Sequence, residues 1–404
     1  MGPLVGRYNP YDPAYIRDPY RQLDRLRAAA PVYHSRVTGS YVVSSYALAA
    51  EVLADRRYGT NRKTDSSLRS RMFFRLARFT QEEENALDNT MGAVPDEVHQ
   101  RMRKAIAYDF GKRRLTELLP RMEFWVDRLL DEAAARGQID LIEDFAAKLP
   151  ILVAAELLGF PPQDARKLQE WSDSYLVLVD PLIKGAGIAR MNAAFHQFDP
   201  YVADTLRRKR AEPGDDLITR LLEHHRDGEF DDVQLRVLIM LLMIAGHEVI
   251  TNLIGNAVAC LLRFPDQRVR LAGGPELMPA AIEEFVRYES PIQAVWRIAG
   301  EDLEIAGVRV PATRAVTVLI GAANNDPEEF ADPRRLDLAR TDNRHLGFAL
   351  GSHYCAGPWL ARIEGAVALS RLLERFPGFR GDASRLRWKP AAGLRGLYEL
   401  PLVL

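Results

Sequence analysis

The sequence predicts a mainly α-helical fold with small β-sheets. Apolar residues recur at helical spacing through most of the chain after residue 96. Short runs of β-branched and aromatic residues, bounded by turn residues, are confined to three regions, roughly 30–45, 293–318 and 386–404. Because no internal repeat and no Gly/Ser-rich linker interrupts this pattern, we expect residues 1–404 to form a single domain.

The N-terminal quarter alternates short helices and strands. Residues 18–30 and 45–54 have helical spacing, and residues 32–34 and 41–43 are expected to be strands. Residues 57–95 are polar and lack a strong period, which predicts a functional loop or a mobile lid.

Helices dominate from residue 96 onwards. The longest periodic segment covers residues 231–263, from an acidic start to the Phe-Pro step that ends it. A further helix follows Cys355 over residues 356–376, and residues 386–404 are expected to form a terminal hairpin. The other predicted helices span residues 96–110, 114–136, 140–158, 162–178, 190–211, 215–224 and 275–289.

Composition and charge exclude several functions. With 47% hydrophobic and 27% charged residues, the chain has the composition of a soluble globular protein. A formal net charge of −1 gives no general attraction to nucleic acid or to an anionic membrane. The longest apolar run, residues 237–246, is too short to span a bilayer. Two cysteines without a secretory signal are typical of the reducing cytoplasm, where we expect the protein to act.

Cys355 lies in a glycine-rich segment before a predicted helix, in the pattern Phe348-x-x-Gly351-x-x-x-Cys355-x-Gly357. Backbone N–H groups at a helix N-terminus lower the pKa of a cysteine, so this sulfur is suited to ligate a haem iron as a thiolate. In this interpretation Gly351 permits a bend, Gly357 lets the backbone approach a flat ligand, and Phe348 shields the sulfur. A buried structural cysteine in a glycine-rich turn is the alternative.

A second motif lies upstream, where Glu284 and Arg287 are spaced i, i+3 on one predicted helix face. Alone, such a pair is common on solvated helices. Arg297 follows after a proline and a strand-like run, and two Asp-Pro turns then precede the Cys355 segment. The order of these features along the chain is therefore more informative than the pair itself.

Together, these motifs resemble those of the cytochromes P450, specifically the soluble bacterial type. The resemblance covers nearly the whole chain and rests on His99-x-x-x-Arg103, Ala245-Gly246-His247-Glu248, Glu284-x-x-Arg287, Arg297 and residues 345–364. It implies the cytochrome P450 fold and haem b (iron protoporphyrin IX), with Cys355 as the axial ligand of the iron. It also implies that Glu284 and Arg287 form a buried structural pair. The residues that match propionate-binding positions are His99, Arg103, Arg297 and His353. Solvated surface histidines are the alternative for His99 and His353.

In this family the helix over residues 231–263 crosses the distal face of the haem. The resemblance implies that Ala245 and Gly246 leave room for dioxygen, and that Glu248 relays protons as a general acid. A carboxylate on a helix surface is the alternative for Glu248. Val249 departs from the family pattern, which has a threonine at this position. Valine lacks the hydroxyl that supports dioxygen activation, and Thr251 faces another side of the helix.

Val249 has three interpretations. A substrate hydroxyl or an ordered water supplies the missing hydrogen bond, or the enzyme is a peroxygenase that uses peroxide directly. The third is an atypical oxidation that forms a C–N or C–C bond in place of hydroxylation. Each fits a monooxygenase-type oxidoreductase dedicated to one small organic substrate, and we expect its setting to be bacterial secondary-metabolite biosynthesis.

The resemblance also indicates which segments surround the substrate. They are the polar region before residue 95, the end of the predicted helix 162–178, the long helix, the strand after residue 291 and the terminal hairpin. The candidate pocket residues on them are Phe73, Phe74, Val94, Val179, Met243, His247, Ile292, Val295, Trp296 and Leu394. Plain core packing is the alternative for each.

The chain has no second cysteine cluster and no Gly-rich dinucleotide motif. The resemblance therefore implies that electrons come from a separate ferredoxin and ferredoxin reductase, or from a flavodoxin system. Basic residues between 101 and 114 either face such an acidic partner or form a solvated helix surface. Two other classes stay open: a non-catalytic haem-binding protein, against which Glu248 argues, and a helical binding protein without haem.

Overall fold

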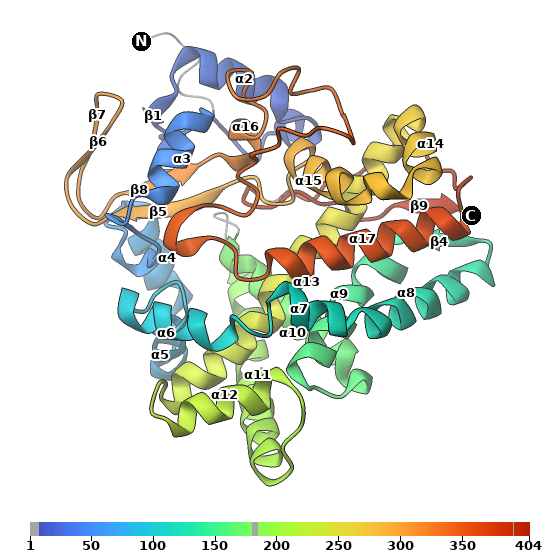
Figure 1. Cartoon of the computed structure of the whole chain (residues 1–404). Coiled ribbons are helices and arrows are strands. Elements are labelled where there is room, and N and C mark those ends of the chain that lie inside the picture. Colours follow the sequence, from blue (N-terminus) through green and yellow to red (C-terminus); the bar gives the residue numbers. More distant parts are fainter. Residues whose placement is uncertain (1–7, 180–184, 391) are drawn as a thin grey trace.

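The computed structural model describes residues 8–179, 185–390 and 392–404, apart from the side chains of residues 178, 179 and 185. Helices form most of it, with a five-stranded sheet on one side and a two-stranded sheet on the opposite side (Figure 1). This architecture confirms the predicted fold class, mainly α with small β-sheets.

The α-helices in the first half of the chain are α1 (Pro13–Arg17), α2 (Tyr20–Ala29), α3 (Tyr46–Ala54), α4 (Leu68–Ala77), α5 (Gln81–Asp88), α6 (Asp96–Ile106), α7 (Lys112–Glu117), α8 (Leu119–Ala134), α9 (Lys148–Leu158) and α10 (Ala165–Ser174). The later α-helices are α11 (Gly185–Ala211), α12 (Leu217–Arg226), α13 (Asp232–Arg263), α14 (Pro265–Gly273), α15 (Met278–Tyr288), α16 (Ile320–Ala323) and α17 (Pro358–Arg375). The short 3₁₀-helices are η1 (Arg62–Thr64), η3 (Pro162–Asp164), η4 (Tyr175–Val179), η5 (Pro275–Leu277) and η6 (Gly351–His353). One short π-helix, η2 (Leu141–Ala146), precedes α9.

The sheets join segments that are far apart in the sequence. The five-stranded sheet has the order β1-β2-β8-β5-β3, in which β2 and β8 run parallel and the other neighbours antiparallel. Separate two-stranded sheets pair β4 with β9 and β6 with β7. The strands are β1 (Val32–His34), β2 (Tyr41–Val43), β3 (Tyr58–Gly59), β4 (Gln138–Asp140), β5 (Val295–Ala299), β6 (Leu303–Ile305), β7 (Val308–Val310), β8 (Ala315–Val318) and β9 (Pro401–Val403).

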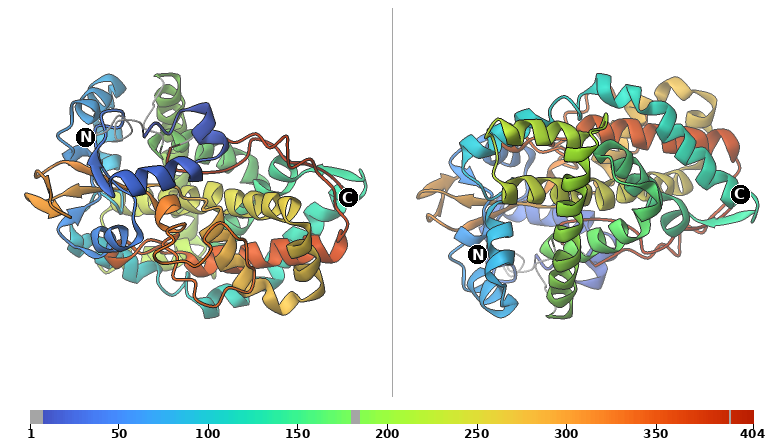
Figure 2. Two further views of the ribbon diagram at one scale, coloured as in Figure 1. Left: turned by 90° about the horizontal axis from the view of Figure 1, so that it is seen from above. Right: turned by 90° about the horizontal axis from the view of Figure 1, so that it is seen from below.

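Helix α13 runs through the middle of the helical part, as the two views of Figure 2 show. Asp231 and Gln234 begin it with a capping box, in which each side chain accepts a hydrogen bond from the backbone N–H of the other residue. By length and composition alone, α13 is apolar enough to cross a membrane. However, it packs against α9, α11, α15 and α17, and most of it is buried, which is typical of a core helix.

The expected irregular loop over residues 57–95 is wrong for much of that segment, because it contains α4 and α5. The hydroxyl of Ser67 caps α4 by accepting from the N–H of Ser70. Thr80 and Glu83 form a capping box at α5. The Thr80-x-x-Glu83 spacing is visible in the sequence and would have predicted this helix start.

The terminal hairpin is present only in part. The N–H of Lys389 donates to the carbonyl of Gly396, and the N–H of Tyr398 donates to that of Arg387, so the chain does fold back. The last strand, β9, instead pairs with β4, with Ile139 opposite Leu402. Strand β4 falls between the predicted helices 114–136 and 140–158 and overlaps the second only at Asp140. This pairing therefore had no local sequence signal.

Candidate active site

A cavity of about 340 Å³ separates α13 from the segment that carries Cys355. Ala245 and Val249 line it from α13. Phe348, Cys355 and Gly357 line it from the segment before α17. Most of the remaining lining is apolar, so the cavity is suited to a flat hydrophobic ligand.

The Cys355 segment is held in a sharply bent conformation. Gly351 has φ +71°, and a Cβ there would lie 2.7 Å from the carbonyl oxygen of Leu53, so only glycine fits. The N–H of Cys355 donates to the carbonyl of Phe348 at 2.9 Å. A Cβ on Gly357 would come within 3.2 Å of the Phe110 ring, which keeps this backbone bare on one side.

The surroundings of the Cys355 thiol shift its pKa in opposing directions. Burial raises its pKa, although the N–H of Gly357 and the charges of Arg103 and Arg362 act in the opposite direction. Cys355 also precedes the first residue of α17 by three positions, so the helix N-terminus is less close than expected. A thiolate at this position therefore depends on a bound metal cation, because coordination deprotonates a thiol outright.

Arg297 is a buried cation that lacks a counter-charge. It is 5% exposed and lines the cavity from β5. Its Nη1 donates to the carbonyl of Trp296 at 3.0 Å, whereas its Nη2 has no hydrogen-bond partner among the described residues. Burial lowers the pKa of Arg297 to about 10. An unpaired buried guanidinium is costly, so this site favours an anionic group.

Two histidine rings pack against each other next to this arginine, with an angle of 48° between their planes. His353 lines the cavity, and its ring centroid lies 4.6 Å from that of His99. Burial, followed by the charge of Arg297, lowers the pKa of His353 to about 4, so its ring is neutral near pH 7. Arg103 donates from Nη1 to the carbonyl of Tyr354 at 2.5 Å and so supports the backbone beside the cysteine. His99, Arg103 and Gly351 do not line the cavity in this structure.

These residues fit a haem. The apolar cavity matches the macrocycle, the sulfur of Cys355 matches an iron ligand, and the unsatisfied Nη2 of Arg297 matches a propionate carboxylate. The fit rests on the shape and chemistry of this chain's own side chains.

On α13, Glu248 is held by a lysine from the C-terminal segment. The Nζ of Lys389 donates to Oε1 of Glu248 at 2.8 Å, and Glu248 is 6% exposed. Asp173 on α10 lies near this pair, and burial followed by the charge of Glu248 raises its pKa to about 6. Glu248 therefore lies at the inner end of a group of charged side chains that reaches the surface at the half-exposed Asp173.

The hydroxyl of Thr251 is not available to the cavity. Its Oγ1 donates to the carbonyls of Ala146 and His247, at 3.0 and 2.9 Å. Val249, by contrast, lines the cavity and offers only methyl groups. The wall of α13 facing Cys355 consequently has no hydroxyl at this position.

A second cavity, of about 540 Å³, adjoins the first. Ala245, Val249, Ile292 and Val295 line both. The predicted pocket residues that line the second cavity are Phe73, Phe74, Ile292, Val295, Trp296 and Leu394. Residues from α4, α13, β5 and the C-terminal segment thus meet around one space, which the sequence alone could only suggest.

Other predicted pocket residues lie elsewhere. Met243 and His247 are buried on a different face of α13, and Nδ1 of His247 lies 3.5 Å from the Asp173 carboxylate. Burial lowers the pKa of His247 to about 4. Val94 packs at the edge of the main core without lining the cavity. The side chain of Val179 lies outside the described residues.

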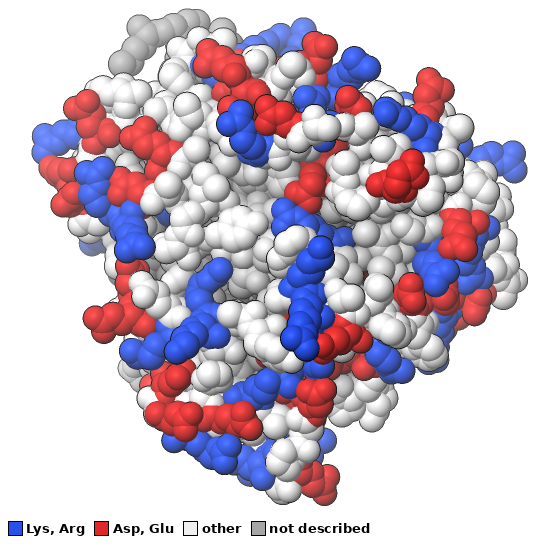
Figure 3. Space-filling view, in the orientation of Figure 1, with Lys and Arg blue, Asp and Glu red and all other residues white. Residues whose placement is uncertain are grey.

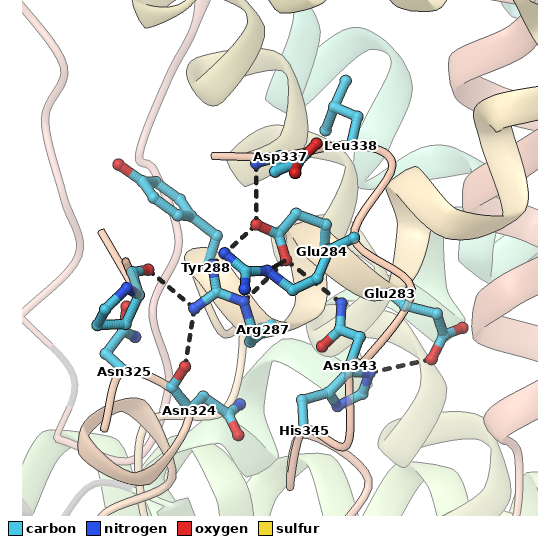
Figure 4. Close-up of polar contacts among 12 residues, drawn as sticks. Glu283, Glu284, Arg287, Tyr288, Asn324, Asn325, Asp337, Leu338, Asn343 and His345 are labelled. Atoms are coloured by element: carbon cyan, nitrogen blue, oxygen red, sulfur yellow. Dashed lines mark hydrogen bonds and ion pairs between the residues drawn. The ribbon is translucent and has the colours of Figure 1, made fainter. Parts of the chain in front are cut away.

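Glu284 and Arg287 form a fully buried ion pair (Figure 4). Both nitrogens Nε and Nη2 of Arg287 donate to the Glu284 carboxylate at 2.8 Å, and Nη1 donates to the carbonyls of Asn324 and Pro333. Glu284 also accepts from the N–H of Asp337 at 3.0 Å. The pair therefore joins α15 to the loops that lead to the Cys355 segment.

A neighbouring cluster joins α15 to α17. Glu283 accepts hydrogen bonds from Arg362 at 2.6 Å and lies 3.0 Å from Nε2 of His345. Although burial alone would raise it, these hydrogen bonds lower the pKa of Glu283 to about 2. Arg362 also lies over the Phe348 ring at 4.4 Å, which fixes the ring beside the cysteine.

Two functional candidates were not anticipated. Lys389 looks like an ordinary surface lysine in the sequence, and nothing local links it to Glu248. Glu83 lies within a run of three glutamates, and its capping-box spacing from Thr80 was a usable signal for its place at a helix start. Only the tertiary structure shows that Lys389 contacts Glu248 and that Glu83 lines the second cavity.

Comparison with known proteins agrees with this geometry. A family model described as Cytochrome P450 matches residues 276–378. Cytochrome P450 107B1 of Saccharopolyspora erythraea is 37% identical over 402 residues, which covers 97% of this chain and 96% of the relative. The 6-deoxyerythronolide B hydroxylase of the same organism is 35% identical over 96% of each chain.

Solved structures show the same fold. The cytochrome P450 enzyme CxnD, for C–S bond formation in chuangxinmycin biosynthesis, has a TM-score of 0.87 at 32% identity, over 95% of this chain and 94% of that chain. The near-complete coverage of the relatives extends the match well beyond the Cys355 region. The chain therefore belongs to the cytochrome P450 family and is a haem-containing oxidoreductase of monooxygenase type.

Proposed function

We propose that this protein binds haem b through Cys355 and oxidises one dedicated organic substrate in bacterial secondary metabolism. The observation that carries the proposal is the cavity bounded by Cys355 and Arg297 on one side and by Ala245 and Val249 on the other. The second, larger cavity beyond Val249 and Ile292 is the substrate site. The setting is supported by the relatives, among them a hydroxylase of 6-deoxyerythronolide B.

Each residue has a definite task in this proposal. Cys355 holds the iron, and Arg297 and His353 hold the propionate side of the cofactor. His99 supports this side through the His353 ring, and Arg103 supports it through the Tyr354 carbonyl. When bound, the haem supplies dioxygen activation and the oxidising equivalents, chemistry that belongs to the cofactor. The protein positions the cofactor and the substrate, excludes water from the site and supplies protons.

Glu248 is the proton carrier at the distal wall. The hydrogen bond from Lys389 engages its Oε1 and holds the carboxylate beside the second cavity, which Glu248 also lines. A proton passes from solvent by way of Asp173 and ordered water to this carboxylate and then into the cavity. Because Ala245 has only a methyl group and Gly246 has no side chain, this part of α13 leaves room for a small ligand such as dioxygen.

Val249 favours an atypical oxidation within this family. Without a hydroxyl at this position, proton delivery beside the substrate depends on water or on the substrate itself. The C–S bond formation named for the structural relative CxnD is a precedent for P450 chemistry other than hydroxylation. Direct use of peroxide is the second candidate, favoured by the same valine.

We further propose an external ferredoxin system in the cytoplasm as the electron source. Basic side chains lie near the middle of the face that carries α6, α7 and α17 (Figure 3). On that face Arg101, Lys104, Lys112 and Arg113 are exposed. Their charge suits an acidic electron-transfer protein.

The test is the absorption spectrum of the reduced, carbon-monoxide-bound protein. We expect the strongly red-shifted band of a thiolate-ligated haem in the natural protein. Cys355→Ser should lose that band, while Cys260→Ser, a change at a cysteine buried in α13, should keep it. A colourless protein after ample haem supply, or an unchanged spectrum in Cys355→Ser, would refute the proposal.

A further inference from the structure

The second cavity is apolar over most of its wall, but polar side chains line it at several places. Glu83 on α5, Tyr175 on η4 and Asn192 on α11 all line it. Each has a buried oxygen without a hydrogen-bond partner in the described part of the chain: Oε1 of Glu83, the hydroxyl of Tyr175 and Oδ1 of Asn192. We call these three side chains the acceptor cluster.

Buried oxygens that lack a hydrogen bond are costly, and they are uncommon unless a ligand or water meets them. Glu83 is the most constrained of the three, with a side chain 5% exposed. Its Oε2 accepts from the N–H of Thr80 at 2.7 Å, which fixes the carboxylate. Its Oε1 is left to face a partner from the cavity.

His196 offers Glu83 only partial compensation. Nε2 of His196 lies 3.2 Å from Oε1, but without hydrogen-bond geometry, and the ring is about half exposed to solvent. An ion pair with one exposed member is weakened by solvent. Burial raises the pKa of Tyr175, and the negative charges of Asp199 and Glu83 raise it further. The tyrosine therefore stays neutral and lies within electrostatic range of the Glu83 carboxylate.

The rest of the wall defines the body of the ligand. Phe73, Phe74 and Phe79 pack edge to face or tilted, with centroids 4.9 to 6.3 Å apart, and all three line the cavity. Along α13 the lining runs from Val237 to Val249, a rise of about 18 Å at 1.5 Å per residue. An elongated, mainly apolar molecule fits this space.

Two basic residues line the same cavity, and they favour a different ligand. Lys63, however, is paired with Asp88 at 2.8 Å. Arg62 lies over the Trp296 ring at 5.1 Å, and burial lowers its pKa although the charge of Asp65 acts in the opposite direction. Lys63 therefore has a hydrogen-bonded counter-charge within the protein, and Arg62 has an aromatic ring and Asp65 near it. By contrast, Oε1 of Glu83 has only the half-exposed His196, and the other two oxygens of the acceptor cluster have no hydrogen-bond partner among the described residues.

We propose that the acceptor cluster selects an elongated apolar substrate whose polar end donates hydrogen bonds and carries a positive charge. This inference rests on the proposed function, because it names the substrate class of the same site. Glu83 supplies the negative charge, and Tyr175 and Asn192 accept the remaining N–H or O–H groups. The polar end is held at the cluster while the apolar body reaches toward Val249.

The test compares three probes with the same chain length, each below its micelle concentration: dodecylguanidinium, 1-dodecanol and dodecanoate. A guanidinium stays protonated and does not ligate iron, so its binding reports the pocket alone. Dissociation constants are measured by calorimetry on the haem-loaded protein. We expect dodecylguanidinium to bind about tenfold tighter than 1-dodecanol, which corresponds to about 1.4 kcal/mol, and dodecanoate to bind weakest.

Variants assign the preference to the cluster. Glu83→Gln removes the charge but keeps the capping bond to Thr80, so the fold is retained. It should lose about tenfold in affinity for dodecylguanidinium and change 1-dodecanol binding by less than about twofold. Glu82→Gln removes the same charge from an exposed position on the same helix and should change nothing.

Tightest binding of dodecanoate, or equal effects of Glu83→Gln and Glu82→Gln, would overturn the inference. Those outcomes in a protein that shows the thiolate-haem spectrum would leave the proposed function standing. Loss of that spectrum in the natural protein would instead contradict the proposed function.

Discussion

Val249 stands where the family pattern has a threonine. It lines both cavities and places methyl groups where a hydroxyl is usual. The nearby Thr251 hydroxyl is bonded to backbone carbonyls and cannot compensate. The hydrogen-bond pattern at this one position therefore bears directly on how protons reach the substrate.

We expect Val249→Thr to change the ratio of product formed to reducing equivalents consumed by roughly twofold to fivefold, since one hydrogen bond contributes about 1 kcal/mol. The measurement is product yield against NADPH consumed in a reconstituted system. Val249→Ala is the control, because it alters volume without adding a hydroxyl. Identical ratios in all three proteins would mean that position 249 has no special role.

Glu364 on α17 is a second residue with an unusual environment. It lines the haem cavity, is 1% exposed, and neither carboxylate oxygen has a hydrogen-bond partner among the described residues. Burial raises its pKa from 4.5 to about 8. The folded protein consequently holds a proton here that the unfolded chain releases at lower pH.

This proton makes stability depend on pH in a defined direction. The contribution is fully present below about pH 4.5 and is lost as the pH rises to about 8, by up to about 1.4 kcal/mol per pH unit. Glu364→Gln should therefore match the natural protein near pH 5 and exceed its free energy of unfolding by roughly 1–3 kcal/mol at pH 8. Urea unfolding at both pH values tests this, with the exposed Glu374→Gln as control. Parallel pH profiles would contradict it.

At the scale of elements, the Glu284–Arg287 pair connects α15 with the long loop before Cys355. The pair is held by two hydrogen bonds between its members, and its bonds to Asn324, Pro333 and Asp337 reach the start and the middle of that loop (Figure 4). Such a bidentate geometry needs the planar guanidinium of arginine. The cysteine is thus positioned by a helix more than sixty residues earlier in the sequence.

Arg287→Lys should lower the free energy of unfolding by about 3–5 kcal/mol, because a lysine leaves buried oxygens unsatisfied. It should also reduce haem retention, since the Cys355 segment loses its support. Thermal unfolding and the ratio of haem to protein absorbance measure both effects.

The same substitution in the exposed Arg166–Glu170 pair is the control. That pair has side chains 92% and 62% exposed and a separation of 3.0 Å. Its loss should cost less than about 0.5 kcal/mol. Equal effects at the two sites would show that the buried pair has no structural role.

For the whole molecule, the face that carries α6, α7 and α17 presents exposed basic residues (Figure 3), and Cys355 lies just before α17 in the sequence. Attraction between this face and an acidic partner should depend on ionic strength. The Debye length falls from about 10 Å at 0.1 M salt to about 3 Å at 1 M.

We expect Lys104→Gln and Lys112→Gln each to slow reduction by a ferredoxin by about twofold to fivefold at low salt. The difference should vanish near 0.5 M salt, because the charges are then screened. Stopped-flow reduction kinetics provide the measurement. Lys148→Gln on α9, where the lysine lies 3.9 Å from Asp144, is the control and should have no effect.

Pairing between strands that are far apart in the sequence also bears on whether the chain forms one domain or several. Strand β2 pairs with β8, and β4 with β9, so each of these pairings joins the first half of the chain to the second. The single domain over residues 1–404 stays a prediction, which these pairings favour.

The sequence by itself determined the chemistry that is carried by neighbouring residues. The Cys355 motif, the Glu284–Arg287 spacing and the period of α13 depend only on short separations, and local backbone geometry translates those directly into structure. Through the family resemblance that they carry, these features were enough to predict the fold class and a haem cofactor.

Only the tertiary structure decided which distant side chains meet. Lys389 reaches Glu248 across 141 positions, and Glu83, Tyr175 and Asn192 converge from three different elements. Met243 was expected in the pocket but faces the core, because the rotation of a helix is set by its packing partners. Contacts of this kind follow from how elements pack, and no spacing along the chain encodes them.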